Sequence, residues 1–189
     1  MAIKIFIDQG HNPSGANAGA EGNGLREQDI TYIVGMYLYD LLSANPNFEA
    51  KVSRTNRYQY IGTSNLSSLQ ERVDMANDWG ADYFISIHTN GAAAASANGT
   101  EAYVFRVDTA AYYLAENIVN AIVRRMGMRN RGVFARPSLY VLRKTKMPSM
   151  IIEIGFITNY EDAQKMNNDP YGFAYAIYQG ILRYFGFLQ

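Results

Sequence analysis

Short apolar runs along the chain predict a set of buried β-strands. Residues 3–8 are apolar and rich in β-branched side chains, which is typical of a buried strand. Residues 82–88 form a continuous apolar run, the pattern of a strand in a sheet that is covered on both faces. Further runs predict strands at residues 48–55, 100–107, 138–143 and 150–154.

Between these runs, apolar residues recur every three or four positions, which predicts amphipathic helices. In residues 25–44 the pattern includes Ile30, Val34 and Leu38. Gly80 is expected to close the second helix, because glycine readily adopts the left-handed conformation of a helix end. The predicted helices cover residues 25–44, 66–79, 110–126, 160–168 and 171–187.

The alternation of strands and helices predicts an α/β fold with a mostly parallel sheet of about six strands, flanked by helices on both faces. Residues 9–24 and 91–98 are rich in small and polar side chains and are predicted to be loops. The sequence contains neither an internal repeat nor a linker, so residues 1–189 are expected to form a single domain.

Composition narrows the classes of function. The formal net charge is zero, which argues against a long nucleic-acid-binding surface. The absence of cysteine excludes disulfides, thiolate metal ligands and a cysteine nucleophile. No run approaches the roughly 20 apolar residues of a membrane span, and no signal peptide precedes the first predicted strand. If the protein acts outside the cell, we expect that its leader is missing from this sequence or that another system releases it.

One acidic residue interrupts the apolar run at residues 150–154. Glu153 lies between Ile152 and Ile154, and burying a carboxylate costs free energy unless it is paired, bound to a ligand or neutral. The residue also lies near the end of its predicted strand, beside a turn at Gly155. This position suggests chemistry more than packing.

Three further polar residues are expected at the same edge of the sheet. His11 follows the first predicted strand, His88 ends the strand at residues 82–88, and Glu27 lies in the first turn of the first helix. Ligands of open α/β sheets bind at the carboxyl ends of the strands. We therefore expect these three side chains to converge with Glu153.

Two imidazoles and one carboxylate form a three-ligand zinc site with a position left for water. His11 and His88 are the only histidines of the chain, and Glu27 and Glu153 fill the two carboxylate roles, ligand and proton carrier. Taken singly, each residue also has an ordinary interpretation: a hydrogen-bonded histidine, a helix-dipole partner for Glu27, or half of a buried ion pair for Glu153. Their convergence favours the metal site.

Other catalytic motifs fail at a defining residue. Residues 10–15 have the glycine spacing of a phosphate-binding loop, but Ala16 stands where lysine is required. A dinucleotide fingerprint that starts at Gly22 fails because Glu27 occupies the place of its third glycine. Residues 62–66 lack the last glycine of a nucleophile elbow. Nucleotide binding and serine hydrolysis are therefore disfavoured.

The four candidate site residues lie in four segments that follow one another along the chain. They are Ile7-Asp-Gln-Gly-His11, Asn23-Gly-Leu-Arg-Glu27, Ser86-Ile-His-Thr-Asn90 and Glu153-Ile-Gly-Phe-Ile-Thr-Asn159. In order and spacing they resemble the motifs of the zinc-dependent N-acetylmuramoyl-L-alanine amidases, the type 3 amidases of bacterial and phage cell-wall hydrolysis. The first motif of that family usually reads Asp-Pro-Gly-His-Gly-Gly, whereas this chain has Asp8-Gln-Gly-His-Asn-Pro13, which keeps the ligand but alters the loop.

The resemblance implies that His11, Glu27 and His88 hold zinc and that Glu153 is the catalytic carboxylate. It implies a twisted mixed sheet flanked by helices. The implied reaction is hydrolysis of the amide between the lactyl group of N-acetylmuramic acid and L-alanine of the stem peptide. Peptidoglycan would then be the partner, and the extracellular cell wall the place of action, as for an autolysin or an endolysin. We expect a monomer.

Two features outside these segments have alternative interpretations. Glu101 begins the predicted strand at residues 100–107, where it either supports the site from behind the ligands, contacts the solvent on the metal, or is an exposed strand-end charge. Residues 124–146 contain eight cationic residues and no acidic one. They are either a surface for an anionic wall polymer or for stem-peptide carboxylates, or an ordinary solvated face; the solvated face is favoured away from the site.

Two functions besides the amidase are considered. The chain is alternatively a zinc peptidase that acts on stem peptides, or a non-catalytic cell-wall-binding module that has kept the fold. The intact ligand set and the intact Glu153 argue against the module. The physiological role, in phage lysis, sporulation, germination or division, is left open by the sequence.

Overall fold

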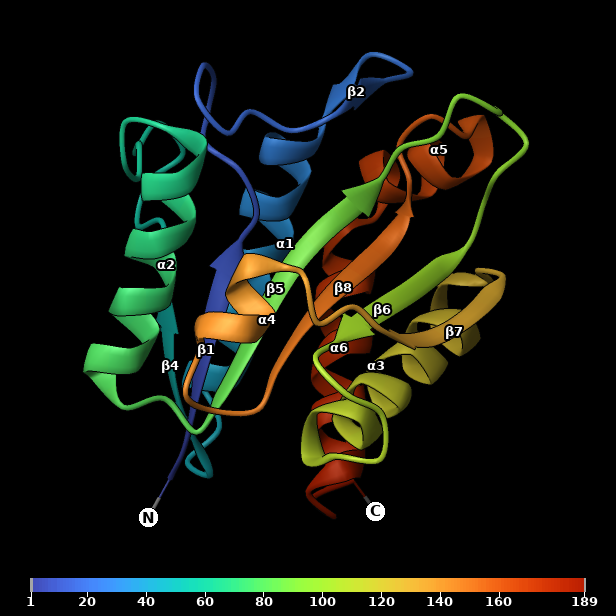
Figure 1. Ribbon diagram of the computed structural model, residues 1–189. Coiled ribbons are helices and arrows are strands. Elements are labelled where there is room, and N and C mark those ends of the chain that lie inside the picture. Colours follow the sequence, from blue (N-terminus) through green and yellow to red (C-terminus); the bar gives the residue numbers. More distant parts are fainter. Residues whose placement is uncertain (1, 189) are drawn as a thin grey trace.

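A six-stranded sheet forms the centre of the structure, a computed structural model that describes residues 2–188 (Figure 1). Its strands are β1 (Ile3–Gln9), β4 (Phe48–Val52), β5 (Tyr83–Asn90), β6 (Thr100–Val104), β7 (Asn130–Ala135) and β8 (Ser149–Phe156). Their order in space is β4-β1-β5-β8-β6-β7. All neighbours are parallel except β6 and β8, which are antiparallel. A two-stranded ribbon, β2 (Glu21–Gly22) with β3 (Leu25–Arg26), lies in the loop after β1.

Helices cover the two faces of the sheet unequally (Figure 1). They are α1 (Glu27–Ser43), α2 (Asn65–Trp79), α3 (Ala110–Met126), α4 (Tyr140–Lys144), α5 (Tyr160–Asn168) and α6 (Pro170–Tyr184). Three long helices, α1, α3 and α6, pack against one face, which we call the back face. Only α2 and the short α4 pack against the other face, the front face.

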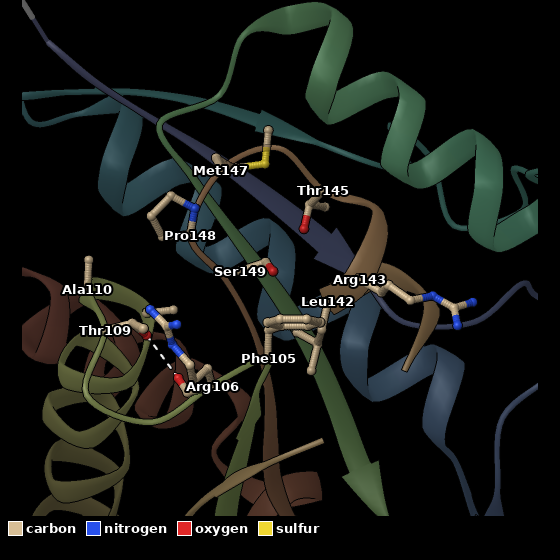
Figure 2. Close-up of a pocket in the computed structure, with 11 residues that line it drawn as sticks. Phe105, Arg106, Thr109, Ala110, Leu142, Arg143, Thr145, Met147, Pro148 and Ser149 are labelled. Atoms are coloured by element: carbon tan, nitrogen blue, oxygen red, sulfur yellow. Dashed lines mark hydrogen bonds between the residues drawn. The ribbon is translucent and has the colours of Figure 1, made fainter. Parts of the chain in front are cut away.

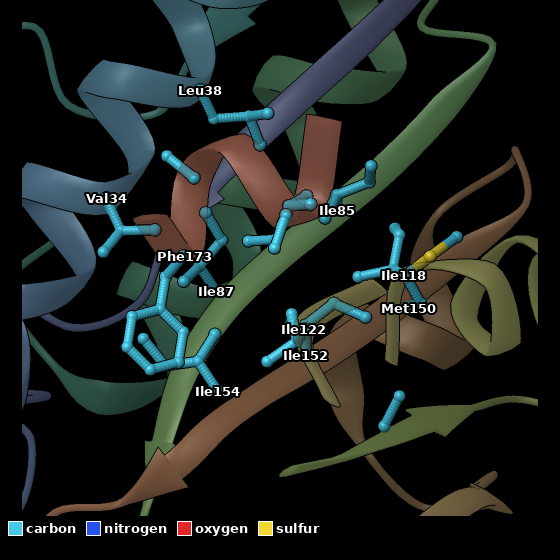
Figure 3. Packing of buried hydrophobic residues seen from close by; sticks show 14 of the residues in the cluster. Val34, Leu38, Ile85, Ile87, Ile118, Ile122, Met150, Ile152, Ile154 and Phe173 are labelled. Carbon is cyan, nitrogen blue, oxygen red and sulfur yellow. The ribbon is translucent and has the colours of Figure 1, made fainter. Parts of the chain in front are cut away.

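The main apolar core lies between the back face and its three helices. Ile85, Ile87 and Ile152 point into it from the two central strands and are fully buried (Figure 3). The helices contribute Val34, Leu38, Ile118, Ile122 and Phe173 to the same cluster. Burying aliphatic side chains of this size contributes about 1.5–3 kcal/mol each, so this layer supplies a large part of the stability.

The front face combines a smaller apolar cluster with polar residues. Phe6, Phe84 and Ile151 pack there against α2 and α4. Side chains along a strand alternate between the two faces of a sheet. His88 and Glu153 are an even number of residues further along β5 and β8, so they also point to the front face, near the carboxyl ends of these strands.

The predicted α/β fold, a six-stranded and mostly parallel sheet with helices on both faces, is confirmed. The strand predicted at residues 138–143 is wrong: Tyr140 begins α4, whose Val141 and Leu142 are buried in the front-face cluster. A short apolar run has the same composition in a buried helical turn as in a strand. The sixth strand is instead β7, an edge strand without a fully buried residue and therefore without the apolar run that marks the others.

Gly80 ends α2 in the left-handed conformation that its sequence position predicts, with φ of 66°. At the other end of the helix, Ser64 and Ser67 exchange hydrogen bonds between side chain and backbone in a capping box. Within residues 2–188, no helix combines the length and the apolar character needed to cross a membrane.

Candidate active site

The structure brings together the four residues that the sequence singles out. His11 lies in the loop after β1, and Glu27 is the first residue of α1. His88 on β5 is the register partner of Glu153 on the adjacent β8. The carboxyl ends of the parallel strands β1, β5 and β8 meet at one edge of the sheet, which is why residues so far apart in sequence meet there.

Three of these side chains converge on one point. The Nε2 atom of His11 lies 3.1 Å from Oε1 of Glu27, Nδ1 of His88 lies 3.0 Å from the same oxygen, and the two nitrogens are 3.1 Å apart. Lone pairs this close repel one another unless a cation or a proton lies between them. These three side chains are a group that could hold a metal ion.

The triangle has dimensions that suit a small divalent cation. Zinc lies about 2.0–2.1 Å from an imidazole nitrogen or a carboxylate oxygen. The centre of the triangle formed by the two nitrogens and the Glu27 oxygen is nearer than this to each of the three atoms. A point just off the plane of the triangle can therefore lie at the zinc distance from all three. Burial alone would raise the pKa of Glu27, but hydrogen bonds and charge interactions with His11 and His88 outweigh it and hold the pKa well below its usual value. Glu27 therefore carries a negative charge at neutral pH, as a metal ligand of this type would need to.

Hydrogen bonds from behind the ligands fix their orientation. Nδ1 of His11 lies 3.2 Å from the carbonyl oxygen of Asn17, so this nitrogen carries the proton and Nε2 keeps its lone pair for the metal. The two oxygens of Glu27 accept hydrogen bonds from the backbone N–H groups of Thr89 and Ala20, each at 2.9 Å. The ligand atoms are thus held in place by the chain itself.

Two glycines make room for the ligands. A Cβ atom on Gly10 would lie 2.5 Å from Cε1 of His88, and one on Gly19 would lie 2.7 Å from Cβ of Glu27. Both separations are shorter than side-chain contacts allow. His11 itself has a φ of 72°, a left-handed backbone that is rare outside glycine and typical of functional sites.

A buried ion pair supports the loop that holds His11. Nη1 of Arg72 lies 2.6 Å from Oδ1 of Asp8, and both side chains are almost completely buried. The second terminal nitrogen, Nη2, donates to the carbonyl oxygen of His11 at 2.7 Å. Burial alone would raise the pKa of Asp8, but the positive charge of Arg72 and a hydrogen bond from Ser86 outweigh it and lower the pKa.

Among the acidic side chains of the site, Glu153 has a buried carboxyl oxygen, Oε2, without a hydrogen-bond partner among the residues that the structure describes. Burial raises the pKa of Glu153 to about 8, and the negative charges of Glu27 and Glu101 add to the rise. A carboxyl group of this kind exchanges a proton readily near neutral pH.

Glu101 is the register partner of Glu153 across the antiparallel β6–β8 pair. It is buried, so it is not an exposed strand-end charge. Its carboxylate accepts hydrogen bonds from Asn90 at 2.7 Å, from Tyr103 at 2.5 Å and from Arg131 at 2.5 Å. These contacts outweigh the effect of burial and lower the pKa of Glu101, which places a fixed negative charge behind Glu153.

A cavity of about 270 Å³ adjoins the site on the front face of the sheet. Its polar end includes His11, His88 and Glu153, and its other end is lined by Leu69, Leu139, Tyr140 and Ile151. A second cavity, of about 450 Å³, lies at the opposite edge of the sheet between Phe105, Arg143 and Met147 (Figure 2). It contains none of the four site residues.

Several supporting residues were not assigned a role from the sequence. Gly10, Gly19 and Asn17 sit in the loop after β1, where composition alone predicts only irregular structure. Arg72 offers a better signal, because it falls on the same face of its predicted helix as Leu69 and Val73. A cation at such a position needs a buried partner, and Asp8 is that partner.

Comparison with known proteins places these features in a family. A family model described as N-acetylmuramoyl-L-alanine amidase matches residues 5–183. The chain is 37% identical over 185 residues to the N-acetylmuramoyl-L-alanine amidase LytC of Bacillus subtilis, with 96% of this chain and 35% of LytC covered. It is 35% identical over 171 residues to the amidase CwlM of Bacillus licheniformis, with 89% of this chain and 62% of CwlM covered. The chain thus spans about a third to under two-thirds of the length of these relatives.

Solved structures show the same architecture. The crystal structure of an N-acetylmuramoyl-L-alanine amidase from Clostridium difficile 630 superposes with a TM-score of 0.86 at 31% identity. The superposition covers 100% of this chain and 99% of that one.

Proposed function

The chain belongs to the N-acetylmuramoyl-L-alanine amidase family, and on this premise we propose that it is a zinc-dependent peptidoglycan hydrolase. The bond cleaved is the amide between N-acetylmuramic acid and L-alanine of the stem peptide. The enzyme acts outside the cytoplasm, on the cell wall.

One observation carries this proposal. Three ligand atoms from His11, Glu27 and His88 lie within hydrogen-bond distance of one another, and the unpaired carboxyl group of Glu153 lies on the neighbouring strand facing the same cavity. A ligand set of two imidazoles and one carboxylate is that of catalytic zinc hydrolases, in which a fourth position stays open. A non-catalytic module would have no use for the fourth group.

When bound, zinc would polarise the amide carbonyl and lower the pKa of the attacking water. The chain itself must manage the proton, because an amide nitrogen leaves only after it is protonated. Glu153 accepts a proton from the water molecule as the water oxygen attacks the carbonyl carbon. Glu153 then donates that proton to the nitrogen as the C–N bond breaks, which yields a lactyl carboxylic acid and a free amino group on L-alanine. The acid passes its own proton to the amino group or to solvent.

The decisive experiment measures metal content and product together. Purified protein is analysed for bound zinc, treated with a chelator, reconstituted with zinc, and incubated with peptidoglycan at each stage. We expect activity to disappear with the metal and to return with it. Mass spectrometry should find new L-alanine amino termini and intact glycan strands. Metal-free protein that still cleaves peptidoglycan would contradict the metal site, and cuts inside the stem peptide would identify a peptidase instead.

Variants of the ligands test the assignment residue by residue. His11→Ala, His88→Ala and Glu27→Ala should each lower zinc occupancy sharply in a protein that remains folded, because the site lies at the edge of the sheet rather than in the back-face core. A variant that keeps tightly bound, stoichiometric zinc removes its residue from the ligand set.

A further inference from the structure

Part of the front face beyond the active site is not covered by a helix. Tyr103 on β6 and Phe134 on β7 are register partners, so their side chains share one side of the sheet. Phe134 is 44% exposed, and its ring extends over Gly132, where a Cβ atom would lie 3.7 Å from Cζ of the ring. Tyr103 also lines the cavity of the active site. Tyr103, Phe134 and Arg136 together form what we call the β6–β7 shelf.

Arg136 is the cationic group of this shelf. The central carbon of its guanidinium lies 5.4 Å from the centre of the Tyr103 ring, a cation–π arrangement. Its backbone N–H donates to the carbonyl oxygen of Val104 at 2.8 Å, which fixes the residue beside β6. The side chain is exposed, and within residues 2–188 it takes part in no ion pair. Arg131, by contrast, is paired with Glu101.

The order of the strands sets where the β6–β7 shelf lies relative to Glu153. β8 lies between β5 and β6, so Glu153 lies between the ligand His88 and the β6–β7 shelf. The residue that protonates the leaving nitrogen must lie beside that nitrogen. On the proposed function the leaving nitrogen of the stem peptide lies beside Glu153. Tyr103 and Arg136 lie on the side of Glu153 away from His88.

The positive charge of the β6–β7 shelf favours an anionic group of the substrate. Residues 124–146 contain no acidic residue. The carboxylate of Glu101, which accepts a hydrogen bond from Tyr103, is already paired with Arg131. The guanidinium of Arg136 thus has free donors that match a carboxylate in a two-pronged hydrogen bond. We propose that Arg136, which lies over the ring of Tyr103, binds a carboxylate of the stem peptide and so orients the leaving group. This inference rests on the proposed amidase function.

The test compares muramyl peptides of one length in which each carboxylate in turn is replaced by a carboxamide. For the parent protein, one such replacement should raise KM about fivefold, the size expected of an exposed ion pair, and leave kcat unchanged. Arg136→Gln should raise KM by the same factor for the carboxylate peptide and have no effect on the amidated one. Arg136→Lys keeps the charge without the two-pronged geometry. Its KM for the carboxylate peptide should lie between the values of the parent and of Arg136→Gln.

Arg143→Gln is the matched control. Arg143 belongs to the same basic segment but lines the cavity at the opposite edge of the sheet (Figure 2). If both glutamine variants weaken cleavage equally, the arginines serve general attraction to an anionic wall polymer, and the inference is overturned. It is also overturned if Arg136→Gln affects both peptides equally or neither.

A binding measurement keeps this result separate from the proposed function. Calorimetry with the same peptides lacking the muramyl group measures recognition of the leaving group without any cleavage. If the parent cleaves no muramyl peptide, the proposed function fails. The Arg136 inference still stands when the protein prefers the carboxylate peptide and Arg136→Gln abolishes that preference, and it falls when no preference exists.

Discussion

Adjacent residues of the central strands lie in opposite environments. Ile87 and Ile152 point to the back face, where they are fully buried among aliphatic side chains from three helices (Figure 3). His88 and Glu153 directly follow them in the chain and point to the front face, beside a cavity. The pleat of the sheet thus separates stability from chemistry at a spacing of one residue.

The division is incomplete, because the front face also contains a buried ion pair. Asp8 and Arg72 are as inaccessible as the aliphatic core, and Arg72 also donates to the carbonyl oxygen of His11. Part of the front face therefore stabilises the fold and also positions His11, a residue that we propose as a metal ligand. Substitutions on the two faces should show where the boundary lies.

The largest effect is expected for Glu153→Gln, which keeps the shape of the side chain and removes the proton transfer. Turnover should fall by roughly two to four orders of magnitude, while zinc content and thermal stability stay close to those of the parent. All three are measured on one preparation. Glu161→Gln is the control, since Glu161 is exposed on α5 and should behave like the parent. Normal turnover would end the role of Glu153, and loss of zinc would make it a ligand.

Asp8→Asn should show that the front face also contributes to stability. It leaves the charge of Arg72 buried without its partner, which costs about 3–5 kcal/mol in the free energy of unfolding. Denaturant titration measures the loss, and Asp74→Asn on the exposed side of α2 should stay within about 0.5 kcal/mol of the parent.

The dependence of this loss on pH has a defined sign. The pKa of Asp8 is lowered in the folded protein, so its contribution is present above the ordinary value of 3.8 and fades as the pH falls through the lowered pKa. The difference between parent and Asp8→Asn should therefore persist at neutral pH and shrink only in acid. A difference that vanishes near pH 7 would rule out the ion pair as its source.

Gly10→Ala should separate metal binding from folding. The new methyl group would press on the His88 ring and on the backbone oxygen of Ile87. Displacing the ring should weaken zinc affinity by about tenfold to a hundredfold, measured by competition with a chromogenic chelator. Gly91→Ala is the control, because the nearest atom to its methyl group would be Cβ of Ala20 at 3.5 Å. Equal zinc affinity in the two variants would show that the ring has room to move.

The smallest effect is expected for Ile152→Val, next to Glu153 but on the back face. Loss of one buried methylene should lower the free energy of unfolding by about 0.5–1.5 kcal/mol and leave kcat unchanged. Denaturant titration and steady-state kinetics measure the two quantities. A loss of kcat without a loss of stability would show that the back face controls the position of Glu153.

The sequence predicts the parts of this molecule that depend on long, regular patterns. The apolar runs at β1, β5 and β8 and the periodic helices α1 and α3 are strong signals, and together they specify the sheet. Because parallel strands end at one edge, the meeting of His11, Glu27 and His88 also follows from the pattern.

What the sequence does not predict depends on contacts across the fold. The strand β7 is stabilised by pairing with β6 rather than by an apolar run of its own. The segment predicted as a strand at residues 138–143 instead contains most of α4, because Val141 and Leu142 fill a space between α2 and β8 that only the assembled sheet creates. The cation–π contact of Arg136 with Tyr103 likewise joins residues whose neighbourhood is set by the pairing of β6 with β7.

The left-handed backbone at His11 sets the stability of the fold against retention of this histidine during evolution. A residue other than glycine pays about 1–2 kcal/mol for this conformation, and His11 adopts it with φ of 72°. In the absence of metal, the His11→Gly variant should therefore have a higher free energy of unfolding than both the parent protein and the His11→Ala variant. A screen for heat resistance that is carried out on metal-free protein would select His11→Gly and discard a residue that we propose as a zinc ligand. Laboratory evolution of this scaffold must consequently select for turnover in every round.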